Sequence, residues 1–210
     1  NFYVLGIGKN RRNRKVPGAS RFTAAATGTR YTWGTRHYSK GSYRKTFIYN
    51  TNGTIYHMDD NGNVASSQTG FALNMYPCSE VMRVASNDIL YFSAGDTTGM
   101  YSHDGNIGNT WTKETNVTLN FVGMVSHLDR LFAFEEDSDI LRFSKNLDPT
   151  NFTDSTDAGQ ITIGAKRGSK ISFIVLLNGT LYIVKPDSIF RLAGRTPAEF
   201  EVIEVVPSLG

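Results

Sequence analysis

The chain has 210 residues, of which 40% are hydrophobic and 20% charged, enough for one globular domain or a small repeat array with its own core. Its 13 Phe, 10 Tyr and 2 Trp exclude a disordered chain, because so many aromatic side chains cannot be left in water. The single cysteine, Cys78, excludes a disulfide within the chain, and no apolar stretch approaches the roughly 18 residues of a membrane span.

The net charge of +3 conceals two parts of opposite sign. Residues 1–58 contain eleven Lys and Arg and no acid, which gives this part a charge of +11. Residues 59–210 contain eleven Lys and Arg against nineteen acids, which gives the remainder −8. Such an asymmetry indicates a charged partner or neighbour.

Residues 1–45 are rich in Gly, Ser, Thr, Ala and basic residues with isolated aromatics, and this composition predicts a basic, irregular N-terminal arm, either extended or made of poorly regular strands. Its densest charge cluster is assigned to assembly or to contact with DNA. Three interpretations of the cluster stay open: neutralisation of nucleic-acid phosphates, docking on the acidic surface of a neighbouring subunit, or a solvated tail. No nucleic-acid-binding module accompanies it, so sequence-specific recognition is not expected. The cluster consists of Lys9, Arg11, Arg12, Arg14 and Lys15.

Between residues 46 and 210 the apolar pattern is strand-like, with short runs of β-branched and aromatic residues separated by Gly, Asn, Asp and Ser. No window of a dozen residues has the spacing of an amphipathic helix, so we predict an all-β chain. The clearest predicted strands span residues 47–49, 54–58, 89–92, 130–134, 171–176, 180–184 and 188–192.

One pattern occurs four times along this part of the chain: a turn, an apolar and aromatic strand, a polar turn and a second strand. The copies align on Tyr56, Tyr91, Phe132 and Tyr182, with spacings of 35, 41 and 50 residues. A four-stranded propeller blade occupies roughly 40–50 residues. We therefore predict, in residues 46–210, a β-propeller-like array of about four small antiparallel sheets, which can be incomplete, with a β-sandwich as the alternative.

The sequence indicates no catalytic, cofactor-binding or metal-binding residues. Residues 6–8 begin like a dinucleotide fingerprint but lack its third glycine, and residues 59–63 lack the ligand spacing of a calcium loop. The four His residues have no zinc spacing. Residues 102–111 resemble a degenerate Asp-box, which is a structural hairpin motif of sialidase-type propellers.

Further polar groups are interpreted as structural. A group of carboxylates between two strands is predicted to form a solvated turn, and three arginines are predicted to lie on outward strand faces. Cys78 is interpreted as a buried structural thiol. The carboxylates are Glu135, Glu136, Asp137 and Asp139, and the arginines are Arg130, Arg142 and Arg191. Together with Arg83, these arginines could in principle supply a sialidase-like carboxylate-binding cluster, but nothing in the sequence groups them.

The third and fourth copies carry turn motifs that resemble a pattern of bacteriophage tail proteins with β-propeller folds, including the nozzle and hub proteins of short-tailed phages. The likeness covers residues 125–195 best. Its elements are a His-x-Asp-Arg-Leu strand at 127–131, a strand ending in Ser144, an Asp-Pro-x-Asn-Phe turn at 148–152, the Asn-Gly-Thr-Leu-Tyr segment at 178–182 and a strand leading to Gly194.

The resemblance implies a non-enzymatic structural protein of the virion, a nozzle- or hub-type ring subunit that guides or retains DNA. It implies as partners other copies in a homo-oligomeric ring, other tail proteins and packaged DNA in a non-specific contact, with no cofactor and no membrane span. It places the protein in the phage tail, and in the host cytoplasm during assembly. The alternative is a glycan-binding or sialidase-like β-propeller that recognises a receptor.

Overall fold

The computed structural model describes residues 31–38, 44–50, 52–58, 64–72, 77–105, 110–165 and 168–207. Their regular structure consists of β-strands and one short 3-10 turn, η2 (Pro197–Glu199). All-β structure follows from the sequence because its short apolar runs are rich in β-branched and aromatic residues, which fit a pleated sheet.

The strands form four antiparallel sheets, and each sheet uses four strands that follow one another in sequence. Sheet 1 contains β1 (Tyr31–Tyr38), β2 (Arg44–Asn50), β3 (Thr54–Met58) and β4 (Val64–Gln68). Sheet 2 contains β5 (Cys78–Val84), β6 (Asn87–Ser93), β7 (Met100–His103) and β8 (Thr112–Lys113). Sheet 3 contains β9 (Phe121–His127), β10 (Arg130–Glu135), β11 (Ile140–Phe143) and β12 (Gly159–Thr162). Sheet 4 contains β13 (Phe173–Leu177), β14 (Thr180–Val184), β15 (Ile189–Ala193) and β16 (Glu201–Val206).

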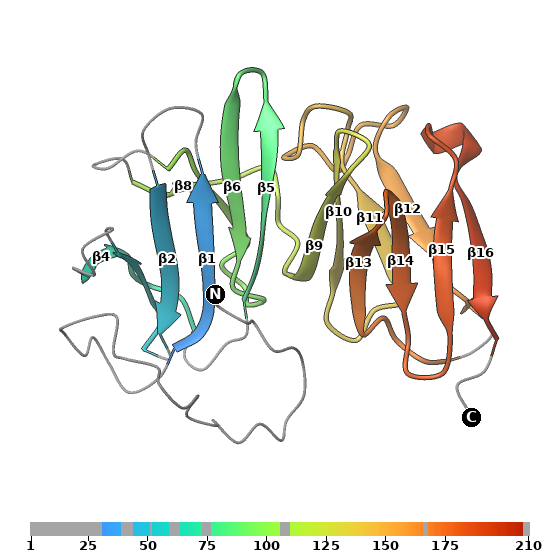
Figure 1. Ribbon diagram of the computed structural model, residues 1–210, viewed down its shortest axis with the longest axis horizontal. Coiled ribbons are helices and arrows are strands. Elements are labelled where there is room, and N and C mark those ends of the chain that lie inside the picture. The colour runs from blue at the N-terminus through green and yellow to red at the C-terminus, as the bar shows by residue number, and fades with distance from the viewer. Residues whose placement is uncertain are drawn as a thin grey trace.

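The four sheets are arranged like blades around a common axis (Figure 1). The first strands of the sheets lie near the centre, where β5 contacts β9 and β9 contacts β13, and the last strands of sheets 1 and 4, β4 and β16, lie at the two outer ends. This arrangement confirms the predicted propeller-like array of small antiparallel sheets.

Three apolar cores join the sheets, one between each neighbouring pair. The second strand of each middle sheet is apolar on both faces. In β6, Leu90 packs toward sheet 1 and Tyr91 toward sheet 3. In β10, Leu131 packs toward sheet 2 and Phe132 toward sheet 4. Alternating side chains of one strand therefore enter two different cores, which explains the continuous apolar runs in the sequence.

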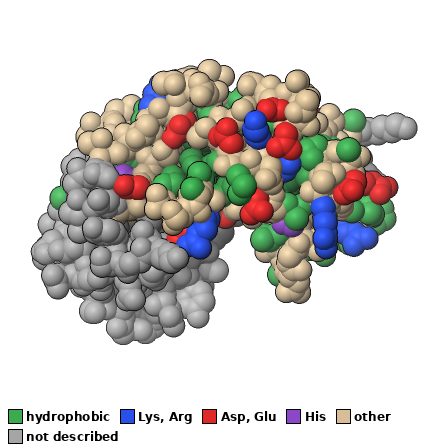
Figure 2. Space-filling model, turned by 90° about the horizontal axis from the view of Figure 1, so that it is seen from above, with side chains coloured by type: hydrophobic (Ala, Val, Ile, Leu, Met, Phe, Trp, Pro, Cys, Tyr) green, Lys and Arg blue, Asp and Glu red, His purple; other side chains and the backbone are tan. Residues whose placement is uncertain are grey.

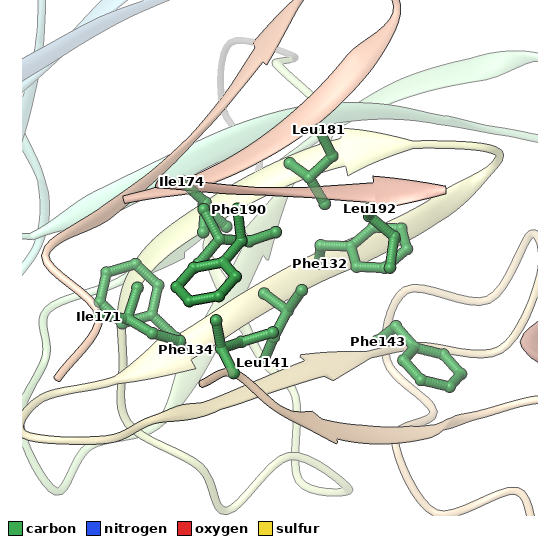
Figure 3. Close-up of a cluster of buried hydrophobic side chains, with 11 residues drawn as sticks. Phe132, Phe134, Leu141, Phe143, Ile171, Ile174, Leu181, Phe190 and Leu192 are labelled. Atoms are coloured by element: carbon green, nitrogen blue, oxygen red, sulfur yellow. The ribbon is translucent and has the colours of Figure 1, made fainter. Parts of the chain in front are cut away.

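The core between sheets 3 and 4 is the largest of the three, and Figure 3 shows how its side chains meet. Aromatic rings of sheet 3 lie against aliphatic side chains of sheet 4. The labelled members are Phe132, Phe134, Leu141, Phe143, Ile171, Ile174, Leu181, Phe190 and Leu192.

The first of the four predicted copies was aligned on the wrong strand. Tyr56 lies in β3, the third strand of sheet 1, whereas the other three alignment residues lie in second strands. The second strands begin at Arg44, Asn87, Arg130 and Thr180, which are 43, 43 and 50 residues apart. The short spacing of 35 residues came from this misalignment.

Sheet 1 begins earlier than the composition indicated. The strand β1 and the first residues of β2 fall within residues 1–45, which were predicted to form an irregular arm. The boundary drawn at residue 46 lies inside β2, so sheet 1 draws its first strand from the segment before that boundary.

Glycine is required where β15 ends. Gly194 has φ +92°, and a Cβ placed on it would lie 2.3 Å from the carbonyl oxygen of Glu199. Both the backbone conformation and the close contact exclude a side chain here. This glycine closes the strand motif at 188–194 in the tail-protein resemblance.

Candidate functional site

The densest polar cluster centres on Arg130, at the start of β10, where the side chain is 5% exposed. Its Nη1 donates to the carbonyl oxygen of Ser144 at 3.0 Å and to the carbonyl oxygen of Asp157. Its Nη2 lies 2.5 Å from Asp157 Oδ1. The predicted outward position of Arg130 is therefore wrong, because the connection between β11 and β12 folds back over the guanidinium.

Asp157 is held as a carboxylate by two neighbours. Arg130 donates to one side of it, and the backbone N–H of Asn146 donates to its Oδ2 at 3.0 Å. These hydrogen bonds, that of Arg130 first, hold the pKa of Asp157 below its usual range. The pair is consequently ionised at neutral pH.

A second ion pair lies beside the first. Lys145 Nζ is 3.0 Å from Asp154 Oδ2, while Asp154 Oδ1 accepts hydrogen bonds from the backbone N–H groups of Thr156 and Asp157, both at 3.0 Å. The bond from Thr156 is the main reason that the pKa of Asp154 lies far below its usual range, and Lys145 adds to it. Together, Arg130, Ser144, Lys145, Asn146, Asp154 and Asp157 are called the Arg130 network below.

The Asp-Pro-x-Asn-Phe turn fixes the other end of the same connection. Asp148 Oδ1 accepts a hydrogen bond from Thr150 Oγ1 at 2.9 Å, and Asn151 Oδ1 accepts one from the backbone N–H of Asp154 at 3.0 Å. The ring of Phe152 packs against Phe121, with centroids 5.0 Å apart. These are Asx-type turns, in which the side chain replaces a backbone hydrogen bond.

The arrangement makes the connection rigid. The charged groups of the Arg130 network pair with one another, Arg130 with Asp157 and Lys145 with Asp154. These pairs hold the connection between β11 and β12 in one conformation. The motif residues that carry the tail-protein resemblance thus have a shared structural role at this end of sheet 3.

The other arginines considered as a carboxylate-binding cluster are not brought together with Arg130. Arg83 Nε lies 3.0 Å from Asp88 in sheet 2, and Arg142 Nε lies 3.4 Å from Glu135 in sheet 3. Arg191 is exposed on β15 in sheet 4, as predicted.

The acidic residues around the turn between β10 and β11 were predicted to be solvated, and only some of them are. Glu136 and Asp137 are exposed there, in agreement with the prediction. Glu135, in contrast, pairs with Arg142, and Asp139 lies 4.0 Å from Lys170 Nζ. Arg142 lies on the face of β11 opposite the buried Leu141 and Phe143, as the alternation predicted, and it is half-buried there between Glu135 and Gln160.

The Asp-box-like segment contributes to the core between sheets 1 and 2. His103 is buried, and its Nδ1 accepts a hydrogen bond from the backbone N–H of Gly105 at 2.8 Å. Trp111 packs edge-on against Phe47, with centroids 5.1 Å apart. Both aromatic residues therefore have structural roles. Residues 106–109 lie outside the described part.

The sequence did not mark Glu80 as a notable residue. Glu80 is on β5 of sheet 2, and its side chain is on the face that packs against sheet 3. Burial raises the pKa of Glu80 to about 6, and a hydrogen bond with the backbone of Ser126 opposes this only partly. Its partner position across the sheet is the buried Tyr91. In the sequence, Glu80 occupies an ordinary polar position of an alternating strand, so no local signal marks it.

Lys185 was also not identified. It follows β14 and is 1% exposed, and its Nζ lies 3.5 Å from the carbonyl oxygen of Gly164. Burial lowers the pKa of Lys185, while the charges of Asp139 and Asp187 oppose this change. Cys78 is half-buried, and its Sγ donates to the carbonyl oxygen of Phe121 at 3.4 Å.

The predicted site residues of the basic arm, Lys9, Arg11, Arg12, Arg14 and Lys15, lie outside the described residues. Within the described ranges, no group of three or more His, Cys, Asp or Glu side chains is placed to hold a metal ion. A search of the same ranges finds no helix with the length and apolar character needed to cross a membrane.

No family model and no curated protein matches the sequence. Among solved structures, a streptogramin B lyase matches with a TM-score of 0.50 and 14% identity, over 76% of this chain and 50% of that one. A catalytically inactive virginiamycin B lyase from Staphylococcus aureus with quinupristin matches with a TM-score of 0.47 and 16% identity, over 76% and 51%. The chain thus spans about half the length of these structures. At such identities the likeness concerns the fold, and the chain has a β-propeller-like fold.

Proposed function

We propose that the chain is a non-enzymatic structural component of a bacteriophage tail, a nozzle- or hub-type ring subunit that guides or retains DNA and contacts neighbouring tail proteins. The observation that carries this proposal is the Arg130 network with its Asp-Pro-x-Asn-Phe turn. The motifs at 127–131, Ser144 and 148–152, which resemble tail proteins, lie together in one unit, in which the buried Arg130 pairs with the half-buried Asp157, Lys145 pairs with Asp154, and Asx turns fix the loop.

The proposed mechanism is mechanical. Sheets joined by three continuous apolar cores form a rigid wall, because packed protein interiors deform little. The basic arm then reaches the DNA path or the acidic surface of a neighbour. Figure 2 shows acidic side chains spread over the described surface, with basic ones between them.

The pairing of the arginines favours this role over the glycan-binding alternative. A sialidase-like site needs free guanidinium groups that converge on the carboxylate of a sugar. Here Arg83, Arg130 and Arg142 each form an ion pair with a carboxylate of the same chain. Arg83 belongs to sheet 2, and the other two belong to sheet 3.

The DNA contact can be tested on the purified chain by replacing Lys9, Arg11, Arg12, Arg14 and Lys15 together with Ser. Five phosphate contacts predict that the logarithm of the DNA-binding constant falls with the logarithm of salt concentration with a slope of about −4.5, and that the variant loses this dependence. The matched control is Arg195→Ser, which removes an exposed charge from the loop after β15. If both variants bound DNA equally well, the five basic residues of the arm would not contact the DNA.

The assignment to the tail is tested by immunogold labelling of phage particles whose genome encodes the chain. Label at the tail is the expected result, and particles without label would contradict the proposal. Saturable binding on a glycan array, or turnover of a fluorogenic sialoside, would replace it with the receptor-recognition alternative.

A further inference from the structure

The tripeptide Asn-Gly-Thr occurs at 52–54 and again at 178–180, and each copy leads into a strand. An asparagine before glycine loses its side-chain ammonia readily, because glycine has no Cβ to shield its backbone nitrogen. The same tripeptide predicts the same reactivity at both places, so a difference between the copies must come from the structure. A third Asn-Gly pair, Asn61-Gly62, lies outside the described residues.

The copy at 52–54 is held in place by hydrogen bonds. The register pairs Asn50 with Thr54, so three residues connect β2 to β3. Asn52 Oδ1 accepts a hydrogen bond from the backbone N–H of Thr54, and Asn52 Nδ2 donates one to the hydroxyl of Tyr56, both at 3.1 Å. The backbone N–H of Gly53 donates to the carbonyl oxygen of Asn50 at 3.0 Å. Both ends of the Asn52 amide and the neighbouring backbone nitrogen are therefore occupied.

Gly53 is also packed beneath the segment that follows β4. Its carbonyl oxygen accepts a hydrogen bond from the backbone N–H of Phe71 at 3.2 Å, and a Cβ placed on it would lie 2.2 Å from the carbonyl oxygen of Phe71. Phe71 belongs to the core between sheets 1 and 2. Movement of this loop would therefore disturb a core contact.

The copy at 178–180 is open. The register pairs Leu177 with Thr180, so two residues connect β13 to β14. Asn178 has φ +50° and Gly179 has φ +75°, as a type I′ turn requires. Both residues are exposed, and apart from the chain neighbours no atom lies within 4 Å of a Cβ placed on Gly179. Within the described residues, no hydrogen bond engages the Asn178 side chain or the backbone N–H of Gly179.

The position of this turn keeps it accessible to water. It joins β13 to β14 at the ends of the strands and does not lie on a sheet face (Figure 1). Sheets that pack face to face cover the side chains along their strands. Packing of another sheet against sheet 4 would therefore leave the tip of this turn in water.

We infer that Asn178 is a site of spontaneous deamidation and that Asn52, in the same tripeptide, is protected. The backbone nitrogen of Gly179 loses its proton and attacks Cγ of Asn178. The new C–N bond closes a succinimide ring, and the side-chain nitrogen leaves as ammonia. Water then opens the ring at either carbonyl group, which gives aspartate or isoaspartate. Water is the only co-reactant, and no oxidant or cofactor takes part.

Ring closure requires rotation of the Asn side chain and of the bonds around it, so the rate depends on how easily the turn opens. The amide of Asn178 is free to rotate. At Asn52, three hydrogen bonds must break first, and each lowers the reactive population by about fivefold. In the folded chain, Asn52 should therefore react about a hundredfold more slowly than Asn178.

The two products differ in their effect on the β13–β14 hairpin. Aspartate adds a negative charge but keeps the turn, because Asp-Gly also forms type I′ turns. Isoaspartate inserts the side-chain methylene into the main chain and lengthens the loop. The pairing of Leu177 with Thr180 depends on a loop of two residues, so isoaspartate displaces this pair.

The experiment incubates the folded chain at mildly alkaline pH and follows both sites by tryptic peptide mapping with tandem mass spectrometry. Asn178 is the only asparagine between Lys170 and Arg191, so the peptide that spans this range reports on Asn178 alone. Deamidation appears as the mass gain of an amide replaced by a carboxyl group, and isoaspartyl methyltransferase labels the isoaspartate product. The chain unfolded in urea is the reference, in which both copies should react at similar rates.

Two variants test the structural causes. Asn178→Gly removes the reacting amide but keeps the turn, because Gly-Gly also adopts type I′, and its peptide should show no deamidation. Tyr56→Phe removes one hydrogen bond from the Asn52 amide, so it should raise the rate at Asn52 by about fivefold and leave the rate at Asn178 unchanged.

Equal rates at Asn52 and Asn178 in the folded chain would overturn the inference, since the structure would then not distinguish the two copies. An Asn178 that reacts in the unfolded chain but stays intact in the folded one would also overturn it, because the turn would then be held closed. The inference depends on the two turns and not on the proposed function, so the two can fail separately.

Discussion

Sheets 3 and 4 use the same strand pattern but differ in what covers them. In sheet 3, side chains on both faces of β10 are buried, and the Arg130 network secures one end of the sheet. In sheet 4, β14 buries Leu181 and Ile183 on one face, while the other face exposes apolar side chains of β13. An apolar strand pattern therefore shows that both faces of a sheet can be buried. Whether a face is buried depends on whether a neighbouring sheet packs against it.

The largest expected effect comes from breaking the core that the two sheets share. Phe132→Ala removes a fully buried ring between sheets 3 and 4. We expect the free energy of unfolding to fall by about 3–5 kcal/mol, because a cavity remains where the ring was. Urea denaturation followed by fluorescence measures this change. A loss below about 1 kcal/mol would show that the two sheets do not form one cooperative unit.

Two arginines provide the next comparison. Arg130→Ala leaves the Asp157 carboxylate and the Ser144 carbonyl without their guanidinium partner, and we expect a loss of about 3 kcal/mol in the free energy of unfolding. Arg191→Ala removes the same side chain from the exposed face of sheet 4 and should cost less than about 0.5 kcal/mol. Equal losses in urea denaturation would contradict a structural role for the Arg130 network.

The interface between sheets 2 and 3 should respond to pH through Glu80. Because burial raises its pKa from 4.5 to about 6, the folded state binds the proton more tightly than the unfolded state. The stability contributed by Glu80 is therefore fully present below pH 4.5 and is lost as the pH rises through about 6. Glu80→Gln should be more stable than wild type by about 2 kcal/mol at pH 8, and the difference should vanish at pH 4.

Melting curves across this pH range measure the difference between Glu80→Gln and wild type. Glu136→Gln is the matched control, because Glu136 is exposed in the turn between β10 and β11. A difference for Glu80→Gln that stays constant between pH 4 and pH 8 would exclude titration of Glu80 as its cause.

The smallest effect should come from the outer face of sheet 4. Leu177→Ala changes a side chain that is 57% exposed, so it should change the free energy of unfolding by less than about 0.5 kcal/mol. Urea denaturation measures the change. A loss above about 1 kcal/mol would show that this face of sheet 4 is covered in the folded protein.

The sequence was sufficient for the all-β class and for several strands, but not for the grouping of the strands in sheet 1. Predicted strands at 54–58 and 180–184 coincide with β3 and β14, because alternation and flanking Asn-Gly turns mark both clearly. The misalignment of Tyr56 arose from the same signal. An Asn-Gly turn precedes β3 in sheet 1 and β14 in sheet 4, although these are a third and a second strand.

The polar sites could not be predicted in the same way. Alternation along β10 placed Arg130 on an outward face, but alternation contains no information about a long connection that returns over the strand. Glu80 has no local signal because its burial depends on β9, which is about forty residues away in sequence. Composition placed the arm boundary at residue 46, because the sparse apolar content of β1 resembles an irregular segment.

Each sheet consists of four consecutive strands, and this has a consequence for synthesis on the ribosome. All hydrogen bonds between strands within a sheet close over short stretches of chain, and only side-chain cores join one sheet to the next. Local contacts form quickly. The sheets can therefore form one after another as the chain emerges, and each new sheet packs against a preceding sheet that is already in place.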